Sequence, residues 1–330
     1  MTRSASVPPP VTAVIDASGA WLPVQLGSVE KLLRDRGAAH GPRLAEDSTA
    51  TLSAGGKRLR PLLVLLCAGR DGGERAARAA TAVELVHMAS LVHDDVLDHA
   101  PLRRGVPTVA AASGRPRATA TGDLLFAQAF ALLAAPGDRR AVELLSEASV
   151  GLALGELAQR HDAFDMAVSE ARYLERCRLK TARLFECACL MGHSAADGAG
   201  PDGEQALRGF GAEIGIAFQL LDDVLDVTGP PERTGKARGT DLLDGTVNLP
   251  LIVAGRLDPD LRRLDLRQLG SAEAEALCDR IAATGALEEV RERALEMVAA
   301  AKRRLTDPAF DSEQQKLLGL VADGVVERYS

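Results

Sequence analysis

Apolar residues recur every three or four positions along most of the chain, which is the period of a helix with one buried face. The pattern starts at Val29, Leu32 and Leu33. Further helices rich in Ala and Leu are predicted over four stretches: 62–66, 79–97, 124–135 and 141–157. Clusters of Gly, Pro and Asp predict loops at 71–73, 136–138, 195–203 and 229–239. Strand patterns are nearly absent, so we expect an all-α protein of about ten or more helices.

Two of the apolar stretches end in the same pentapeptide, Asp-Asp-Val-Leu-Asp. The copies hold Asp94, Asp95 and Asp98, and Asp222, Asp223 and Asp226. In a helix, residues four apart share a face, so the first and last Asp of each copy lie side by side. Carboxylates this close repel one another unless a cation lies between them. Magnesium fits, because it takes hard oxygen ligands and bridges carboxylates to phosphates. The repeat therefore predicts a shared divalent-metal site that grips a diphosphate.

A single acidic cluster on a helix is more often a solvated surface face. Here both copies have apolar flanks, with Val92 and Val96 around the first and Leu221 and Val224 around the second. Carboxylates in a buried setting cost free energy unless they are paired or bind metal. The flanks and the repetition favour the metal site.

The two clusters also bear on domain organisation. Residues 1–26 are predicted to be a flexible N-terminal tail, because helical periodicity begins only after them. None of the predicted loops is typical of an interdomain linker, and the two clusters would have to cooperate across any boundary. Residues 27–330 are therefore predicted to form one large helical-bundle domain.

Composition narrows the class of protein. Of 330 residues, 46% are hydrophobic, which is ample for a core, and the net charge of -7 argues against nucleic-acid binding. No apolar run is long enough to cross a membrane, and the first residues lack the apolar centre of a signal peptide. The five cysteines are odd in number and mostly far apart, which favours reduced core thiols. We expect a cytoplasmic protein.

Cationic residues accompany the first cluster. Lys57, Arg58 and Arg60 follow Gly55-Gly56, where a glycine turn would let backbone amides and side-chain cations approach a phosphate. A solvated surface turn is an equally open interpretation of this segment alone. Arg103 and Arg104 come after Pro101, which should turn the chain back over the carboxylates. His87 lies two helical turns before Asp94, on nearly the same face.

Further polar residues accompany the second cluster. Lys180 and Thr181 follow a polar helical run, Gln219 shares a face with Asp222, and Lys236 follows Gly235 in a glycine-rich segment. Each is ordinary alone. Together with the carboxylates they supply donors enough for two diphosphates.

The motifs together resemble the trans-isoprenyl diphosphate synthases, or polyprenyl synthetases, of the medium- and long-chain type. The resemblance covers most of residues 55–250, in the family's order and spacing. The matching segments are Gly55 to Pro61, Leu91 to Asp98 with Arg103-Arg104-Gly105, Gly122-Asp123, Gly155-Glu156 with Gln159, Lys180-Thr181, Phe218 to Asp226, and Gly235-Lys236.

The resemblance implies the isoprenoid synthase fold, a helical bundle around a central cavity, and a Mg²⁺-dependent prenyltransferase. Such an enzyme condenses isopentenyl diphosphate head to tail (1'-4) with an allylic prenyl diphosphate to give an all-trans polyprenyl diphosphate. It also implies a homodimer and about three Mg²⁺ ions in each active site.

Residue roles carry over by position. Isopentenyl diphosphate would be held by Lys57, Arg60, His87 and Arg104. The allylic diphosphate would be held by Arg103, Lys180, Thr181, Gln219 and Lys236. Magnesium would be bridged by Asp94, Asp98 and Asp222 and supported by Asp95, Asp223 and Asp226. Asp94, Asp98, Asp222, Lys180 and Arg103 would thereby be catalytic, because a preformed set of charges stabilises the departing diphosphate. No isolated His or Glu stands out as a base, so we expect the released pyrophosphate to remove the final proton.

One position departs from the family's pattern. Thr246 stands where the family usually has Lys, so one cation for the allylic diphosphate is missing. A charged hydrogen bond is worth about 1.5–3 kcal/mol, so Thr246→Lys would raise activity. Alternatively, a neighbouring cation such as Arg238 replaces the missing charge.

Product length should depend on the residues one turn deeper than the first cluster. Ala89 and Ser90 are both small, whereas in this family a bulky aromatic residue at the position of Ala89 closes the cavity at fifteen carbons. The resemblance therefore implies a product of twenty carbons or longer, with Phe126 or Phe130 as a deeper floor.

Two rival functions deserve comparison. A terpene cyclase of the same fold would steer its cations with aromatic walls, but only 3% of the residues are aromatic. A non-catalytic regulatory subunit of a heteromeric synthase would be expected to lose an aspartate cluster, and only Thr246 points that way. The synthase is the better interpretation.

Overall fold

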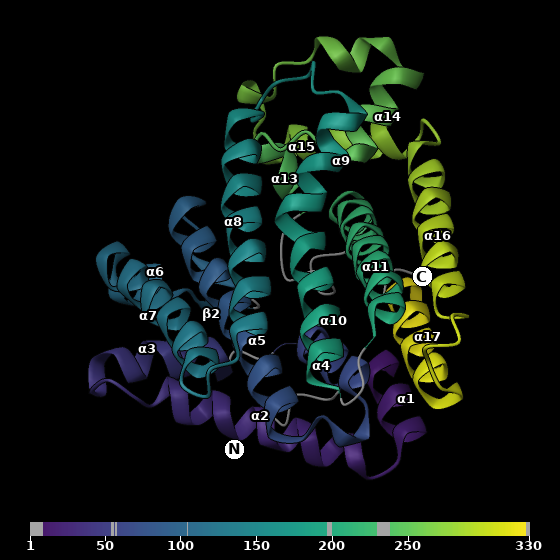
Figure 1. Ribbon diagram of the computed structural model, residues 1–330. Helices are drawn as coiled ribbons and strands as arrows, with labels where there is room; N and C mark the ends of the chain where they lie inside the picture. The colour runs from purple at the N-terminus through teal and green to yellow at the C-terminus, as the bar shows by residue number, and fades with distance from the viewer. Residues whose placement is uncertain are drawn as a thin grey trace.

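The computed structural model describes residues 9–53, 56, 58–103, 105–196, 200–229 and 238–327. Long helices run side by side along most of its length (Figure 1). The central ones are α4 (Leu59–Ala68), α5 (Gly73–Leu97), α7 (Arg115–Ala134), α8 (Arg139–His161), α10 (Arg183–Ala195) and α11 (Pro201–Thr228). α10 packs against α4, α5, α8 and α11, which places it at the centre of the bundle.

α5 shows why these helices form a core. Its side chains are apolar on nearly every side, and Ala80, Val83 and Leu85 are completely buried. A helix that is hydrophobic all round must be covered on all faces. It is covered by α2, α4, α7 and α10.

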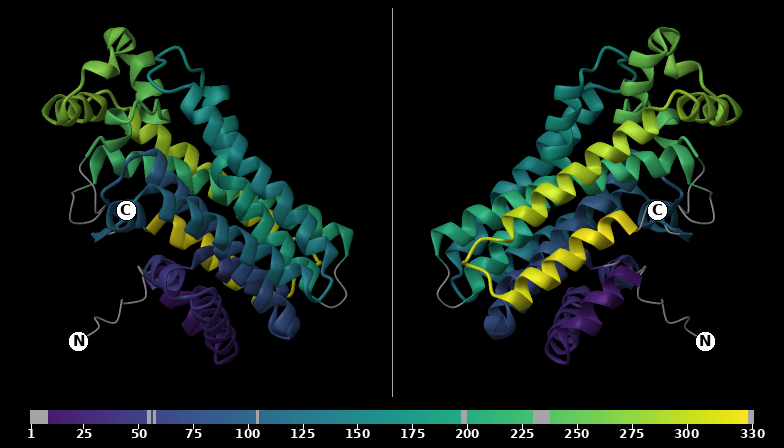
Figure 2. Two further views of the ribbon diagram at one scale, coloured as in Figure 1. Left: turned by 90° about the vertical axis from the view of Figure 1, so that its left-hand side faces the viewer. Right: turned by 90° about the vertical axis from the view of Figure 1, so that its right-hand side faces the viewer.

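The N-terminal helices lie across one side of this bundle. α1 (Pro9–Ser18), α2 (Trp21–Gly37) and α3 (Pro42–Ser53) are drawn in purple beneath it in Figure 2. The predicted flexible tail over 1–26 is therefore wrong from residue 9 onward. Val14 and Leu22 are fully buried, and α1 packs against α17 (Ser312–Glu327). The helical periodicity of α1 is weak because the helix is short. Its burial depends mostly on α17, which is far away in sequence.

The remaining elements close the other end and the sides. They are η1 (Arg70–Gly72), β1 (Leu102–Arg103), β2 (Val106–Pro107), α6 (Val109–Ser113), α9 (Glu170–Cys177), η2 (Arg178–Ala182), α13 (Thr240–Leu243), α14 (Leu249–Leu257), η3 (Pro259–Arg263), η4 (Leu266–Gln268), α15 (Ser271–Ala282) and α16 (Ala286–Arg304). β1 and β2, with two residues each, pair as an antiparallel hairpin just after α5. η2 is a π-helix that joins α9 to α10 without a break in the chain direction.

The all-α prediction is confirmed, and each predicted helix falls within a longer one, except that α7 ends at Ala134, one residue before the predicted end at 135. The predicted loop at 71–73 instead contains the last two residues of η1 and the first residue of α5, and the last three residues of the predicted loop at 195–203 belong to α11. All five cysteines are free and buried, as expected for reduced core thiols. Within the described ranges, no helix is long and apolar enough to span a bilayer.

Candidate active site

A cavity of about 230 Å³ lies where α5, α8 and α11 approach their C-terminal ends. Its wall is completed by α9, η2 and the segment around α13. The lining residues are Asp94, Asp98, Arg103, Gln159, Arg160, Ala163, Tyr173, Arg176, Cys177, Lys180, Thr181, Gln219, Asp222, Asp223, Asp241, Asp244 and Thr246. Both copies of the repeated pentapeptide therefore contribute to one cavity.

Two close helix contacts bring Lys180 and Thr181 to this wall. A Cβ atom on Gly155 of α8 would lie 2.6 Å from the backbone nitrogen of Lys180, and one on Gly215 of α11 would lie 2.5 Å from the Cα of Ala182. Only glycine permits backbones to approach this closely. η2 is therefore clamped between α8 and α11, and π-turns of this kind are frequent at functional sites.

The first pentapeptide is surrounded by cations. Arg103 Nε on β1 donates to Asp95 Oδ1 at 2.7 Å, and Arg160 on α8 donates to Asp98. Asp95 is buried and does not line the cavity. Asp95 thus holds Arg103 over the site, while Asp94 and Asp98 face the cavity.

The second pentapeptide has different partners. Asp223 accepts hydrogen bonds from Tyr173 Oη at 2.6 Å and from Gln219 Nε2 at 2.8 Å. Thr181 Oγ1 in turn donates to Gln219 Oε1 at 2.7 Å. Asp226 accepts from the backbone nitrogen of Asp241 at 3.3 Å. Asp223 is thus fixed by a chain of neutral groups that runs back to η2.

Lys180 interacts electrostatically with acidic residues of both α5 and α8. Its Nζ donates to Glu156 Oε2 at 2.5 Å. Burial alone would lower the pKa of Lys180, but Asp94 and Glu156 outweigh it and raise the pKa above its ordinary value. Burial raises the pKa of Asp94 to about 6, against the opposing effect of Lys180, and Glu156 and Asp98 add to the rise. Burial and the neighbouring Asp241 likewise raise the pKa of Asp223.

These carboxylates fit a divalent cation that is only partly coordinated by protein. In the part of the chain that the structure describes, no three acidic, His or Cys side chains converge tightly enough to hold an ion by themselves. Asp94, Asp98 and Asp222 nevertheless face one cavity, and burial and like charge disfavour the ionised form of Asp94. Magnesium suits such a site, because it binds through one or two carboxylates and completes its shell with water and phosphate oxygens.

The residues predicted to bind isopentenyl diphosphate are placed elsewhere. Arg60 and His87 do not line this cavity, and the Arg60 guanidinium stacks on the buried Phe185 ring at 4.6 Å from its centroid. Burial lowers the pKa of Arg60 to about 10. The other two members, Lys57 and Arg104, lie outside the described residues, as does Lys236 of the allylic set. The predicted second diphosphate pocket thus stays a prediction.

The predicted chain-length residues lie on α5 and α7, which pack against each other, and none of them lines the cavity. Ala89 is completely buried, and Ser90 is half-buried and donates to the carbonyl of His87 at 2.8 Å. Phe126 stacks on His93 at a centroid distance of 5.8 Å, and Phe130 is half-buried against the core.

Three residues of α9 at the cavity were missed from the sequence: Tyr173, Arg176 and Cys177. Together with Lys180 they have the spacing of a single helix face, which is a signal that could have revealed them. Arg160 was also missed. Arg238, the suggested substitute for Lys at position 246, instead donates to the carbonyl of Val227 and to Asp279 and does not line the cavity.

Comparison with known proteins assigns the chain to a family. A family model described as "Polyprenyl synthetase" matches residues 42–282, which include every residue of the cavity wall. The chain belongs to the polyprenyl synthetase family. It is accordingly a prenyltransferase, as its resemblance predicted.

Relatives of this polyprenyl synthetase differ in their products. The chain is 43% identical to heptaprenyl diphosphate synthase component 2 of Geobacillus stearothermophilus, over 73% of this chain and 75% of that protein. It is 38% identical to geranylfarnesyl diphosphate synthase of Aeropyrum pernix, over 87% of this chain and 94% of that protein. The solved polyprenyl synthase of Caulobacter crescentus CB15, complexed with calcium and isoprenyl diphosphate, has a TM-score of 0.89, 33% identity and full coverage of both chains.

Proposed function

We propose that the protein catalyses Mg²⁺-dependent head-to-tail (1'-4) condensation of isopentenyl diphosphate with an allylic prenyl diphosphate, giving an all-trans polyprenyl diphosphate of twenty carbons or longer. One observation carries the proposal. Asp94, Asp98, Asp222 and Asp223, from both pentapeptides, line a single cavity together with Arg103 and Lys180. Carboxylates for metal and cations for phosphate are thus available at one place.

The roles we assign follow the geometry. Asp94, Asp98 and Asp222 would hold Mg²⁺, which when bound supplies positive charge to the departing diphosphate. Arg103, placed by Asp95, and Lys180, placed by Glu156, would orient the allylic diphosphate. Thr181, Gln219 and Asp223 keep η2 and α11 in register. Asp95 and Asp223 are accordingly proposed as positioning residues.

The final proton is proposed to leave on the released pyrophosphate. Within the described residues no histidine lines the cavity, and of the acids that line it, Asp94, Asp98 and Asp222 are assigned to the metal and Asp223 to positioning. The pyrophosphate, held beside the new bond, is then the nearest basic group.

Incubation of the purified protein with Mg²⁺, isopentenyl diphosphate and either farnesyl or geranylgeranyl diphosphate tests the function. Chain-extended products, sized by chromatography, are expected. A cyclised hydrocarbon would point to a cyclase, and a purified dimer that gives no product from any primer would contradict the assignment.

Product length is proposed to depend on Ala89. Phe at this position, five residues before Asp94 on the same helix, should shorten the main product by at least one five-carbon unit. Phe at Ala217, the matching position before the second pentapeptide and equally buried, serves as the control and should leave product length unchanged. An Ala89→Phe enzyme that is folded and active but makes the wild-type product would refute this placement.

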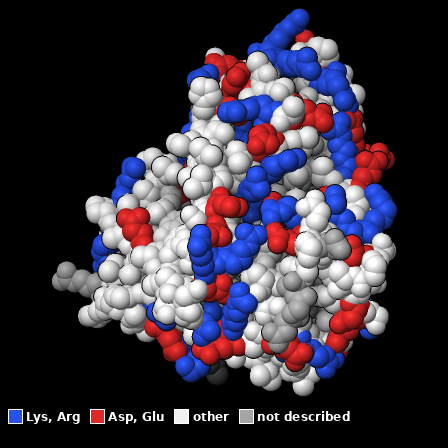
Figure 3. All heavy atoms as spheres, in the orientation of Figure 1, with Lys and Arg blue, Asp and Glu red and all other residues white. Residues whose placement is uncertain are grey.

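The active form is proposed to be a homodimer. Val150, Leu154 and Leu157 form an apolar stripe on α8 at helical spacing, and each is more than half exposed. Positive and negative side chains are interspersed over the face shown in Figure 3, so no broad basic surface for nucleic acid covers it. The relative named component 2 suggests a second arrangement, in which this chain pairs with a different one.

Light scattering on the purified protein, with activity measured on the same sample, separates the two arrangements. A mass twice that of the chain supports the homodimer, whereas an inactive monomer would favour a missing partner.

A cytoplasmic location is also proposed, because five free, buried thiols suit a reducing compartment.

A further inference from the structure

We propose that Arg176 supplies the positive charge that Thr246 does not, and that its guanidinium binds the allylic diphosphate directly. This inference rests on the proposed function, because it assigns a ligand to the same cavity. It makes Arg176 a substrate-binding residue of the reaction.

Arg176 lies on α9, one helical turn before Lys180, and lines the cavity together with Thr246. Its Nη2 donates to the carbonyl oxygen of Val247 at 2.7 Å. The guanidinium therefore sits next to the chain segment in which the family's lysine would stand.

The hydrogen bonding of Arg176 differs from that of the other cations in the cavity wall. Arg103 donates to Asp95 at 2.7 Å, Arg160 to Glu156 at 2.7 Å, and Lys180 to Glu156 at 2.5 Å. The Nη1 of Arg176 is by contrast buried without a hydrogen-bond partner. The side chain is only 4% exposed, so this nitrogen has little access to bulk water.

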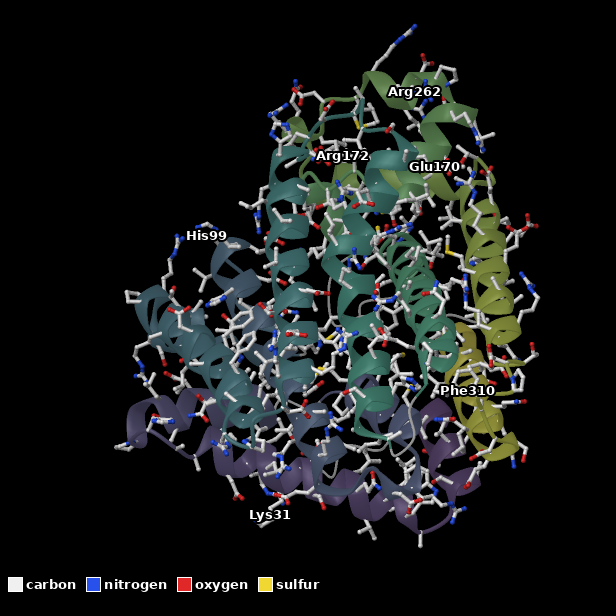
Figure 4. The ribbon with its side chains drawn as sticks, viewed as in Figure 1. Lys31, His99, Glu170, Arg172, Arg262 and Phe310 are labelled. Carbon is white, nitrogen blue, oxygen red and sulfur yellow. The ribbon has the colours of Figure 1, made fainter. Side chains whose placement is uncertain are left out.

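Asp162 forms an ion pair with this nitrogen but does not accept a hydrogen bond from it. Asp162 Oδ2 lies 3.6 Å from Nη1, beyond hydrogen-bond distance, and Asp162 already accepts from Arg172 Nε at 3.0 Å. Arg172 lies on the outer side of α9, where Figure 4 labels it near the end of α8. Asp162 is itself only 5% exposed, and its bonds to Arg172 leave Nη1 of Arg176 without a hydrogen-bond partner.

A diphosphate oxygen is the acceptor that this geometry suits. A buried N–H group without a partner costs free energy, so a ligand that fills the vacancy binds more tightly than contact alone would give. The planar guanidinium donates two parallel hydrogen bonds to phosphate. Arg176 also has the Tyr173 ring at 5.5 Å, which limits its movement.

The test compares Arg176→Gln with Arg178→Gln. Arg178 is two residues further on, is 56% exposed and makes only a long contact with Glu175. We expect Arg176→Gln to raise KM for the allylic diphosphate about 10-fold or more, with KM for isopentenyl diphosphate changed less than about 3-fold. Arg178→Gln should leave both constants unchanged. Calorimetry with Mg²⁺ and inorganic pyrophosphate should show the same loss of affinity for Arg176→Gln alone, independently of turnover.

Rescue distinguishes ligand binding from a structural role. Adding Thr246→Lys to Arg176→Gln should restore at least about 5-fold of the lost kcat/KM, because the new ammonium stands beside the lost guanidinium. A folded Arg176→Gln enzyme with unchanged allylic KM and pyrophosphate affinity would overturn the proposal, as would a loss that Thr246→Lys does not relieve.

If Arg176→Gln does not fold, Thr246→Lys in the wild-type background tests the proposed role of Arg176 instead. Because Arg176 already supplies the charge, less than about a 2-fold gain in kcat/KM for the allylic diphosphate is expected. A gain of about 10-fold or more would show that the charge was missing and would overturn the proposal. Activity of the wild-type enzyme itself is measured separately, so failure of the proposed function would be visible on its own.

Discussion

The two copies of Asp-Asp-Val-Leu-Asp have identical sequences and different surroundings. In the first, Asp95 and Asp98 accept from Arg103 and Arg160, which come from β1 and α8. In the second, Asp223 accepts from the neutral groups of Tyr173 and Gln219, and Asp226 from a backbone N–H. A motif on a helix therefore does not determine its own electrostatics. The neighbouring helices decide which carboxylate faces the cavity and which one holds a neighbour in place.

The largest expected effect is the loss of a cavity-facing carboxylate in the second copy. Asp222→Asn should lower kcat by about 10³-fold or more, because one charge for the divalent cation disappears at the reacting centre. Steady-state rates at saturating Mg²⁺ measure it. Asp226→Asn, one turn further along α11 and not part of the cavity wall, is the control and should cost less than about 10-fold. Equal losses in both variants would mean that the cavity does not define the metal ligands.

The second residue of each copy gives a direct comparison. Asp95→Asn breaks an ion pair in which Asp95 is buried and Arg103 is 27% exposed. Breaking a fully buried pair costs about 3–5 kcal/mol of stability, and we expect the lower end of that range here. Asp223→Asn retains an oxygen that can accept from Tyr173 or Gln219, so its cost should be nearer about 1–3 kcal/mol. Urea unfolding of both variants measures the difference. The reverse order would show that neutral donors hold the second copy more strongly than Arg103 holds the first.

The smallest expected effect concerns stability without metal. The pKa of Asp94 is about 6 in the fold, against about 3.9 in an unfolded chain. The folded protein therefore binds the proton more tightly, and its stability falls as the pH rises from about 4 to about 7. The loss corresponds to about 1–3 kcal/mol.

Asp94→Asn should remove that loss. In EDTA at pH 8 the variant should unfold at higher urea concentration than the wild type, while its activity with Mg²⁺ is lost. At pH 4 the two proteins should differ little. A variant that is no more stable than the wild type at pH 8 would contradict the assigned cost of ionising Asp94.

The sequence predicted which residues form much of this site, but it could not predict which side chains pair with one another. Helical spacing was enough to place Asp94 beside Asp98 and Gln219 on the same face as Asp222. The pairing of Asp95 with Arg103 depends on how β1 folds back, and that of Asp223 with Tyr173 on how α9 meets α11. Local sequence carries neither contact. The burial of α1 was missed for the same reason, since α17 covers it from the other end of the chain.

The carboxylate partners of the cavity's cations also affect which ligands can enter. Arg103, Arg160 and Lys180 each hold an acid that is tethered to the fold. A phosphate ester that arrives alone must compete with a partner whose local concentration is far above its own. A ligand that brings a divalent cation offers the displaced acids a new positive neighbour, and so faces weaker competition. These ion pairs would then act as a filter that admits metal chelates and turns away the cell's other small anions.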